Sequence, residues 1–207
     1  MDRRALITAG LALSATSATT VAASRAAAQP TPGAANEAKV GSGTAPASTY
    51  TAEELVKRIS DALGVTVEAA GGALERVLKD NGRPTGYIAG EEASGAMTVG
   101  LRYGRGLLYM KDRPTQDVFW QGPSIGWDLG GNASRVFTLC YDLQYPDAIF
   151  RRFPGVDGSA YLVGGLGVNY ARADGITLAP IRAGVGLRLG ANVGYLSYSR
   201  KRNIWPF

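Results

Sequence analysis

A pentapeptide in the middle of the chain has the spacing of a hydrolase nucleophile. Gly122-Pro123-Ser124-Ile125-Gly126 matches G-x-S-x-G, in which the serine attacks an ester or amide carbonyl. That chemistry needs a strand, a sharp turn and a helix around the serine, and a histidine to accept its proton. The chain has no histidine, the residues after Ser124 resemble a strand, and no lysine stands at S-x-x-K spacing. We therefore expect no catalytic serine, and retain a serine hydrolase using Ser124 only as a remote alternative.

The absence of histidine limits other chemistry as well. It removes the commonest general base and the commonest transition-metal ligand, so we expect no catalytic residue, no metal and no cofactor. The spacing Gly184-x-Gly186-x-x-x-Gly190 is wrong for a dinucleotide fingerprint. A carboxylate pair can cleave a glycosidic bond, but the sequence places no two acidic residues within reach of each other. We interpret them as turn residues and solvated charges: Glu91, Glu92, Asp128, Asp142, Asp147 and Asp157.

Aromatic residues are the remaining candidates for a binding surface. A Trp or Tyr ring combines a large apolar face with a polar edge, which suits a ligand platform. The same rings also suit a protein core or the end of a barrel, and that alternative stays open. The candidate binding residues are Trp120, Trp127, Tyr195 and Trp205.

The charge of the chain does not favour nucleic acid as a partner. The net charge is +5, and it falls to +3 without the first 28 residues, which contain three arginines and one aspartate. Binding to many phosphates needs dense basic clusters, and the one tight run is Arg200-Lys201-Arg202. We expect no nucleic-acid partner, and keep a weak preference for anionic lipid headgroups or polysaccharide.

Residues 1–28 have the organisation of a cleavable signal peptide. Met1-Asp2-Arg3-Arg4 carries the positive charge, and the apolar stretch 5–13 is shorter than the roughly 20 residues of a spanning helix. Small residues at 26–28 predict cleavage between Ala28 and Gln29. The paired arginines fit both a twin-arginine and an ordinary Sec signal, so the export route stays open. We predict a periplasmic protein whose mature chain has no transmembrane segment.

A polar, small-residue stretch separates this leader from the rest of the chain. Residues 29–48 contain mostly Ala, Pro, Gly, Ser and Thr, which cannot bury enough surface to order themselves, so we predict a disordered linker. We expect one domain over residues 49–207. It has no intramolecular disulfide, because Cys140 is the only cysteine, and we interpret Cys140 as a small buried hydrophobic residue.

Two helices are predicted at the start of this domain, up to about residue 82. Thr51-Ala52-Glu53-Glu54 is a capping box, followed by an apolar stripe at Leu55, Ile59 and Leu63 and a stop at Gly64. A second helix is predicted over residues 67–79. Its internal Gly71-Gly72 pair predicts either a frayed first half or a close packing contact.

From residue 86 onward, glycines recur among β-branched and aromatic residues, which is typical of strands. We predict turns at 104–106, 112–115 and 130–132 and one helical segment over 146–153. The predicted strands are 97–103, 107–111, 118–121, 123–129, 135–143, 159–171, 176–182, 184–189 and 193–198.

This pattern predicts a mainly β fold, a small soluble antiparallel β-barrel of about eight strands connected as a meander and preceded by one or two helices. Repeated glycines on strands favour the tight bending that a small barrel requires. An outer-membrane barrel is the rival interpretation. It would need an uninterrupted apolar band, whereas Arg102, Asp128, Arg182 and Arg188 interrupt the strands here.

Several phrases of this sequence together resemble one family. They are Gly86-Tyr87-Ile88, Gly90-Glu91-Glu92, Ser94-Gly95-Ala96, Gly100-Leu101-Arg102-Tyr103-Gly104, Val118 to Gly126, Asp128-x-Gly130-Gly131-Asn132, Gly158 to Tyr161, Pro180 to Gly186, Asn192 to Leu196 and Pro206-Phe207. Residues 51–207 are similar to the alphaproteobacterial envelope integrity protein A (EipA) family, formerly a domain of unknown function. A fainter similarity, at the level of fold, connects the chain to the SYLF lipid-binding domain.

The resemblance implies a soluble periplasmic β-barrel of about eight strands that supports envelope integrity under stress, with no enzymatic activity and no family active-site residues. The ending around Trp205 departs from the family pattern. We therefore expect a non-catalytic envelope protein that contacts lipid, polysaccharide or another envelope protein. The alternative is a barrel that carries a lipid or small apolar ligand, which requires an interior not filled by large side chains.

Overall fold

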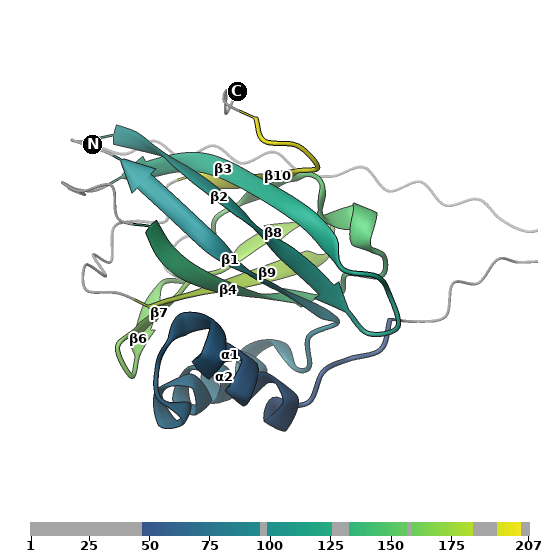
Figure 1. The fold of residues 1–207 in the computed structure, drawn as a ribbon, viewed down its shortest axis with the longest axis vertical. Helices are drawn as coiled ribbons and strands as arrows, with labels where there is room; N and C mark the ends of the chain where they lie inside the picture. The colour runs from purple at the N-terminus through teal and green to yellow at the C-terminus, as the bar shows by residue number, and fades with distance from the viewer. Residues whose placement is uncertain (1–46, 96–98, 126–132, 157–158, 184–193, 204–207) are drawn as a thin grey trace, which may run out of the picture. The chain divides into compact units, whose positions relative to one another are not determined.

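Two helices open the domain and pack side by side against a curled sheet (Figure 1). The computed structural model describes residues 47–95, 99–125, 133–156, 159–183 and 194–203, all of which belong to one compact unit, Gly43–Phe207. Trp127, Trp205, the predicted cleavage site at Ala28 and Gln29, and the predicted strand 184–189 lie outside these residues. The leader and nearly all of the predicted linker do so as well.

Both helices lie where the sequence predicts them. Helix α1 covers Ala52–Leu63; the backbone N–H of Thr51 donates to Glu54 Oε2 at 2.7 Å, and the N–H of Glu54 donates to Thr51 Oγ1 at 3.4 Å. These two bonds satisfy N–H groups that have no partner within a helix. Helix α2 covers Val67–Asn81 and runs through Gly71-Gly72 without a break. A Cβ at Gly72 would touch Val163, so one glycine of the pair does face a neighbouring element.

The described residues contain ten strands in a single sheet, and every strand pair is antiparallel. A short 3-10 helix, η1, covers Pro146–Ile149. The strands are β1 Gly86–Gly95, β2 Val99–Met110, β3 Gln116–Ile125, β4 Ala133–Tyr141, β5 Arg152–Pro154, β6 Tyr161–Val163, β7 Leu166–Val168, β8 Ala171–Ala173, β9 Ile176–Ala183 and β10 Tyr195–Ser199.

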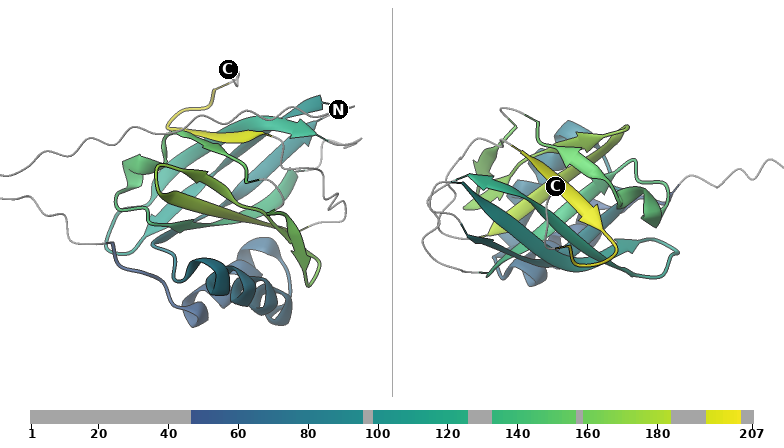
Figure 2. Two further views of the ribbon diagram at one scale, coloured as in Figure 1. Left: turned by 180° about the vertical axis from the view of Figure 1, so that it is seen from behind. Right: turned by 90° about the horizontal axis from the view of Figure 1, so that it is seen from above.

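The connection of the strands differs from the predicted meander. The order across the sheet is β5-β10-β3-β2-β1-β4-β9-β7-β6, with β8 also paired to β9. The chain returns after β3 to place β4 beside β1, and β10 pairs with β3. Gly155 forms an antiparallel bridge with Ala171, which joins the end of β5 to the start of β8. The sheet therefore curls on itself, as the views in Figure 2 show, and the prediction of a barrel-like antiparallel fold is confirmed.

Four local predictions are wrong, each for a physical reason. No turn interrupts residues 104–106, because β2 is one long strand in which Gly104 makes room for the Trp120 side chain of β3 and Gly106 lies close to the backbone of β1. Residues 123–125 continue β3 rather than starting a new strand. Only η1 is helical within 146–153, because the chain then pairs with β10. Residues 159–171 form three short strands, because Gly164 and Gly165 take positive φ angles of 58° and 79° and turn the chain.

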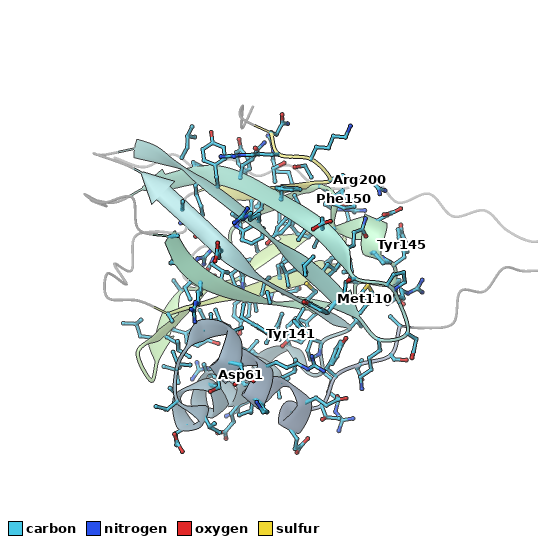
Figure 3. The ribbon with its side chains drawn as sticks, viewed as in Figure 1. Asp61, Met110, Tyr141, Tyr145, Phe150 and Arg200 are labelled. Carbon is cyan, nitrogen blue, oxygen red and sulfur yellow. The ribbon has the colours of Figure 1, made fainter. Side chains whose placement is uncertain are left out.

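Apolar side chains fill two layers, one on each face of the sheet. Figure 3 draws the described side chains on the ribbon. Strand β4 contributes to both layers: Phe137, Leu139 and Tyr141 face the helices, and Val136 and Cys140 face the inside of the curl. The inner layer consists of Ile88, Leu108, Met110, Val118, Trp120, Val136, Cys140, Leu143, Ala148, Ile149, Phe153, Ala171, Ile176, Leu178, Leu196 and Tyr198. Large side chains therefore occupy the interior.

Within the described residues, none of the helices has the length and apolar character needed to cross a membrane.

Candidate functional site

A row of four residues in register crosses the sheet near one end of the interior. Glu92 on β1 pairs with Gly104 on β2, Gly104 pairs with Trp120 on β3, and Trp120 pairs with Tyr198 on β10. A Cβ at Gly104 would overlap the Trp120 ring. The glycine therefore lets the indole lie across β2, where its Nε1–H donates to Glu92 Oε2 at 2.9 Å.

Glu92 is the centre of a buried ion cluster. Arg182 on β9 donates to both carboxylate oxygens, from Nε at 3.1 Å and from Nη2 at 3.3 Å. Its third nitrogen, Nη1, donates to Asn169 Oδ1 at 2.6 Å. Arg102 on β2 forms a second ion pair with Glu92, with Nε 3.2 Å from Oε1. The Glu92 side chain is 4% exposed, so one buried carboxylate stands between two guanidinium groups.

The cluster keeps Glu92 ionised. Burial alone raises the pKa of a carboxyl group, but here the charges of Arg182 and Arg102 and the hydrogen bonds from Arg182 and Trp120 outweigh burial. Together they hold the pKa of Glu92 below its usual value. A carboxylate with a lowered pKa and both oxygens occupied is a poor proton donor and acceptor near neutral pH. Its chemical role is to fix the positions of Trp120, Arg102 and Arg182.

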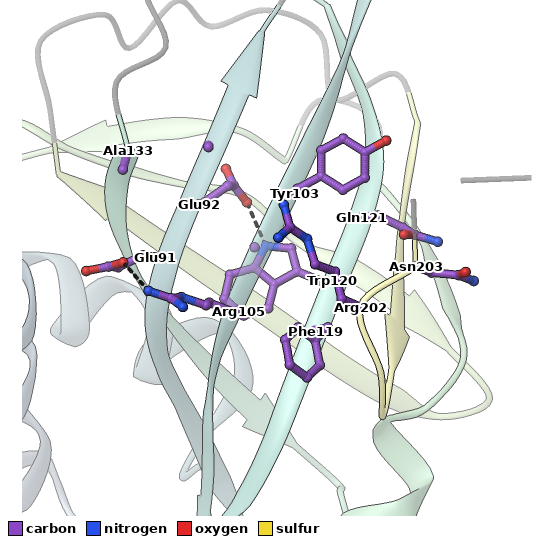
Figure 4. A pocket seen from close by; sticks show the side chains of 12 residues that line it. Glu91, Glu92, Tyr103, Arg105, Phe119, Trp120, Gln121, Ala133, Arg202 and Asn203 are labelled. Carbon is purple, nitrogen blue, oxygen red and sulfur yellow. Dashed lines mark hydrogen bonds and ion pairs between the residues drawn. The ribbon is translucent and has the colours of Figure 1, made fainter. Parts of the chain in front are cut away.

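A pocket of about 280 Å³ lies against these strands (Figure 4). Its walls include two aromatic rings, Tyr103 and Phe119, and the polar side chains of Glu91, Arg105 and Gln121. Glu92, Gly104 and Trp120 also line it, so the pocket and the ion cluster share residues. The segment after β10 adds Arg202 and Asn203.

The charged side chains around this pocket differ in whether they have an ion-pair partner. Glu91 Oε2 lies 3.7 Å from Arg105 Nη2, and both side chains are largely exposed. Glu92 is already matched by Arg182 and Arg102. Arg202 is exposed and forms no ion pair with the residues that the structure describes. The arrangement can hold a ligand through flat apolar faces and several hydrogen-bonding groups. Its described charges are two carboxylates, Glu91 and Glu92, against four guanidinium groups, of which Arg202 has no ion-pair partner among the described residues.

The structure describes two of the four predicted aromatic binding residues, Trp120 and Tyr195. Trp120 is 3% exposed, belongs to the inner layer and is one of the residues that line the pocket. Tyr195 on β10 lies under the guanidinium group of Arg152, whose Cζ is 4.1 Å from the ring centroid. Trp127 and Trp205 lie outside the described residues. A binding role for these residues stays a prediction.

The structure also places the candidate nucleophile Ser124 and several of the acidic residues. Ser124 pairs with Gly100 within the β2–β3 ladder, so its backbone is part of a strand and not a sharp turn after one. Glu91 is an exposed residue on a strand, and Asp147 is exposed and paired with Arg200. Glu92 is the exception to the prediction of solvated acidic residues, because it is buried and paired. Asp142 lies in the turn after β4 with a φ of 59°.

Sequence reasoning missed the ion cluster, although a signal was present. Arg102 and Arg182 stand within strands that consist mostly of apolar residues and glycine, and a charged residue at an inward position needs a buried partner. The pattern alone does not say which acidic residue supplies it, because Glu92 and Arg182 are 90 residues apart.

The single cysteine takes no part in this site. Cys140 is fully buried in the inner layer, as predicted, and burial raises the pKa of its thiol. Among the described residues, no three His, Cys, Asp or Glu side chains are grouped so that they could hold a metal ion.

Comparisons with known proteins agree with this architecture. The model of the family described as envelope integrity protein A matches residues 48–207. A crystal structure described as a β-barrel-like, uncharacterized protein from Brucella abortus is 46% identical in sequence, with a TM-score of 0.70, over 77% of this chain and 99% of that chain. No curated protein matches. Because the family model matches most of its length, the chain belongs to the envelope integrity protein A family.

Proposed function

We propose that this protein is a soluble, non-catalytic protein of the periplasm that maintains the cell envelope under stress by contacting an envelope component. Membership of the envelope integrity protein A family supports a role in the envelope. The signal-peptide pattern of residues 1–28 supports export as the way in which the protein reaches it.

The ionised and fully paired carboxylate of Glu92 is the observation that supports a non-catalytic role. General acid–base catalysis needs a titratable group whose pKa lies near the working pH and whose proton can move. Glu92, the one buried carboxylate beside the described pocket, has a lowered pKa and is held by Arg182, Arg102 and Trp120. With no histidine in the chain, the site is suited to holding a partner rather than to transferring protons.

The packed interior favours surface contact over transport of a ligand inside the barrel. A carrier needs an interior of small side chains, whereas Phe153, Trp120 and Tyr198 are buried there together with several Leu and Ile residues. A lipid tail would have to displace a well-packed apolar layer, which proteins resist. We therefore place the contact with the envelope on the outer surface.

A deletion strain tests the role and its compartment. Expression of the full chain in the deletion strain should restore growth in detergent and under cell-wall stress. A chain that starts at Gln29 behind a new Met should fail to restore growth, because it stays in the cytoplasm. The amount of each protein is checked by immunoblotting of periplasmic and cytoplasmic fractions.

Each part of the proposal has its own contrary result. Normal stress tolerance of the deletion strain would overturn the envelope role. Rescue by the leaderless chain would overturn the periplasmic location. Hydrolysis of ester substrates by the purified protein, lost in a Ser124→Ala variant, would overturn its non-catalytic character.

A further inference from the structure

We propose that the pocket over β1–β3 is a saccharide-binding site that selects a sugar ring carrying a carboxylate. The inference rests on the proposed contact with the envelope and names the chemistry of the component. The residues proposed to contact the ligand all line the pocket.

The first argument is the kind of side chains that the walls combine. Tyr103 and Phe119 offer aromatic faces, and Gln121, Asn203 and Arg105 offer planar amide and guanidinium groups. A pyranose has an apolar face of C–H groups and a rim of hydroxyl groups, so it matches both kinds of wall at once. Apolar and aromatic walls with a few placed polar groups are typical of small-molecule sites, and the faces of curled β-sheets bind oligosaccharides in other folds.

The second argument is the rigidity of the strands that carry the pocket walls. The Trp120 ring packs against Gly104, where no Cβ intervenes, and its Nε1–H is fixed to Glu92. Tyr198 supports the ring from the neighbouring strand, with centroids 5.8 Å apart. A site held in place before the ligand arrives loses less conformational entropy on binding. The buried ion cluster therefore holds β1, β2 and β3 in fixed positions, and the side chains of the pocket walls stand on the other face of these strands.

The third argument is charge. Arg105 is offset by Glu91, whereas Arg202 is exposed and has no ion-pair partner among the described residues. A ligand carboxylate would supply that partner, and a guanidinium group binds a carboxylate through two parallel hydrogen bonds. The predicted ligand is therefore an acidic saccharide rather than a neutral one.

Two other classes of ligand fit less well. An extended peptide adds to a sheet at an edge strand, whereas this pocket lies over β1, β2 and β3, which each have a neighbour on both sides. An acyl chain requires walls that are apolar throughout, whereas this pocket contains Glu91, Arg105, Gln121 and Arg202.

A titration followed by NMR tests the proposal. The purified protein, labelled with ¹⁵N, is titrated separately with a muramic-acid disaccharide and with digalacturonate, which distinguish the acidic sugar of the cell wall from a uronate polysaccharide. Chitobiose and maltose are the neutral controls. We expect chemical-shift changes in β1–β3 and at residues 200–203, with at least about tenfold tighter binding of one acidic sugar than of the neutral ones, or about 1.4 kcal/mol.

Variants locate the binding within the pocket. Arg202→Gln should weaken binding of the acidic sugar about tenfold, and Phe119→Ala should weaken acidic and neutral sugars alike. Lys201→Gln is the matched control, because it removes the same charge from the adjacent exposed residue, which does not line the pocket. Arg202 and Lys201 are exposed, so their substitution should leave the spectrum of the free protein almost unchanged.

The contrary results are specific. Shift changes absent from β1–β3 with either acidic sugar would overturn the site. Equal losses in Arg202→Gln and Lys201→Gln would show attraction by surface charge alone, and equal affinity for acidic and neutral sugars would overturn the selectivity. Shift changes in the same strands with anionic phospholipid micelles but not with sugars would assign the pocket to lipid. Each of these results leaves the stress phenotype of the deletion strain, and so the proposed function, intact.

Discussion

The helix-covered face of the sheet and the charged end of its interior are stabilised by different forces. On the first, Tyr87 stacks on Phe137 and on Tyr109, with ring centroids 4.9 Å and 4.8 Å apart, beneath the apolar stripes of α1 and α2. At the second, Glu92 accepts three hydrogen bonds from Arg182 and Trp120 and forms an ion pair with Arg102. Both regions include β1, on which Tyr87 and Glu92 are only a few residues apart.

The difference predicts different responses to substitution. Apolar packing depends on volume and tolerates changes that conserve it. An ion cluster depends on the matching of charges, because loss of one member leaves the others buried without a partner. The helix-covered face therefore supplies stability that many sequences could provide, and the charged end supplies a fixed geometry that few could. The pocket lies next to the second kind of region.

The largest predicted effect is that of Glu92→Gln. This change conserves the shape of the side chain but removes the negative charge between Arg182 and Arg102. Breaking a buried ion pair on one side typically costs 3–5 kcal/mol, and since both arginines are partly exposed we expect about 3 kcal/mol. Urea unfolding followed by circular dichroism measures the loss. A cost within about 0.5 kcal/mol, the range of ordinary surface changes, would remove the contrast between the two regions.

The same variant has a predicted dependence on pH. The folded pKa of Glu92 is lowered from the usual value of 4.5, so its contribution to stability is complete above about that pH and is lost as the pH falls through the folded value. The difference in unfolding free energy between wild type and Glu92→Gln should be constant near neutral pH and shrink in acid. A difference that grows in acid would mean that Glu92 is protonated in the folded protein.

The second-largest predicted loss of stability comes from substitution of Gly104, the glycine between Glu92 and Trp120 in the row across the sheet. Gly104→Ala places a methyl group against the Trp120 ring. Overpacking costs typically 1–3 kcal/mol, so we expect a loss of about 2 kcal/mol and a shift in tryptophan fluorescence. Gly71→Ala is the control, because nothing lies within 4 Å of its Cβ position and alanine favours a helix by roughly 1 kcal/mol over glycine. Destabilisation by both changes would point to a general intolerance of alanine.

The sequence was sufficient for features that depend on neighbouring residues. The capping box at Thr51 and Glu54, the stripe of Leu55, Ile59 and Leu63 and the stop at Gly64 all follow from helical geometry, and the structure has each of them. The burial of Cys140 also followed from its apolar surroundings. The barrel-like character followed from the glycine-rich strands and from the absence of crossover helices.

Features that depend on distant partners were beyond the sequence. Gly104 and Gly106 have the local pattern of a turn, but they lie inside β2, because Trp120 on another strand needs the space above Gly104. The placement of β4 beside β1 joins segments separated by β2 and β3. The pairing of Glu92 with Arg182, and the position of Arg202 and Asn203 beside β1–β3, arise only when the sheet curls.

The smallest predicted effect separates two adjacent glutamates. Glu91 and Glu92 follow each other on β1, so their side chains point to opposite faces. Glu91 is 60% exposed and lies 3.7 Å from the exposed Arg105, and such surface pairs contribute about 0–1 kcal/mol. Glu91→Gln should therefore change the unfolding free energy by less than about 0.5 kcal/mol, whereas Glu92→Gln should change it by about 3 kcal/mol.

Urea unfolding of both variants in low and high salt measures this contrast. Salt should abolish the small effect of Glu91→Gln and leave most of the effect of Glu92→Gln, because buried charges are screened less. If salt removed both effects equally, the Glu92 cluster would behave as a surface pair, and it could no longer account for a rigid set of strands behind the pocket.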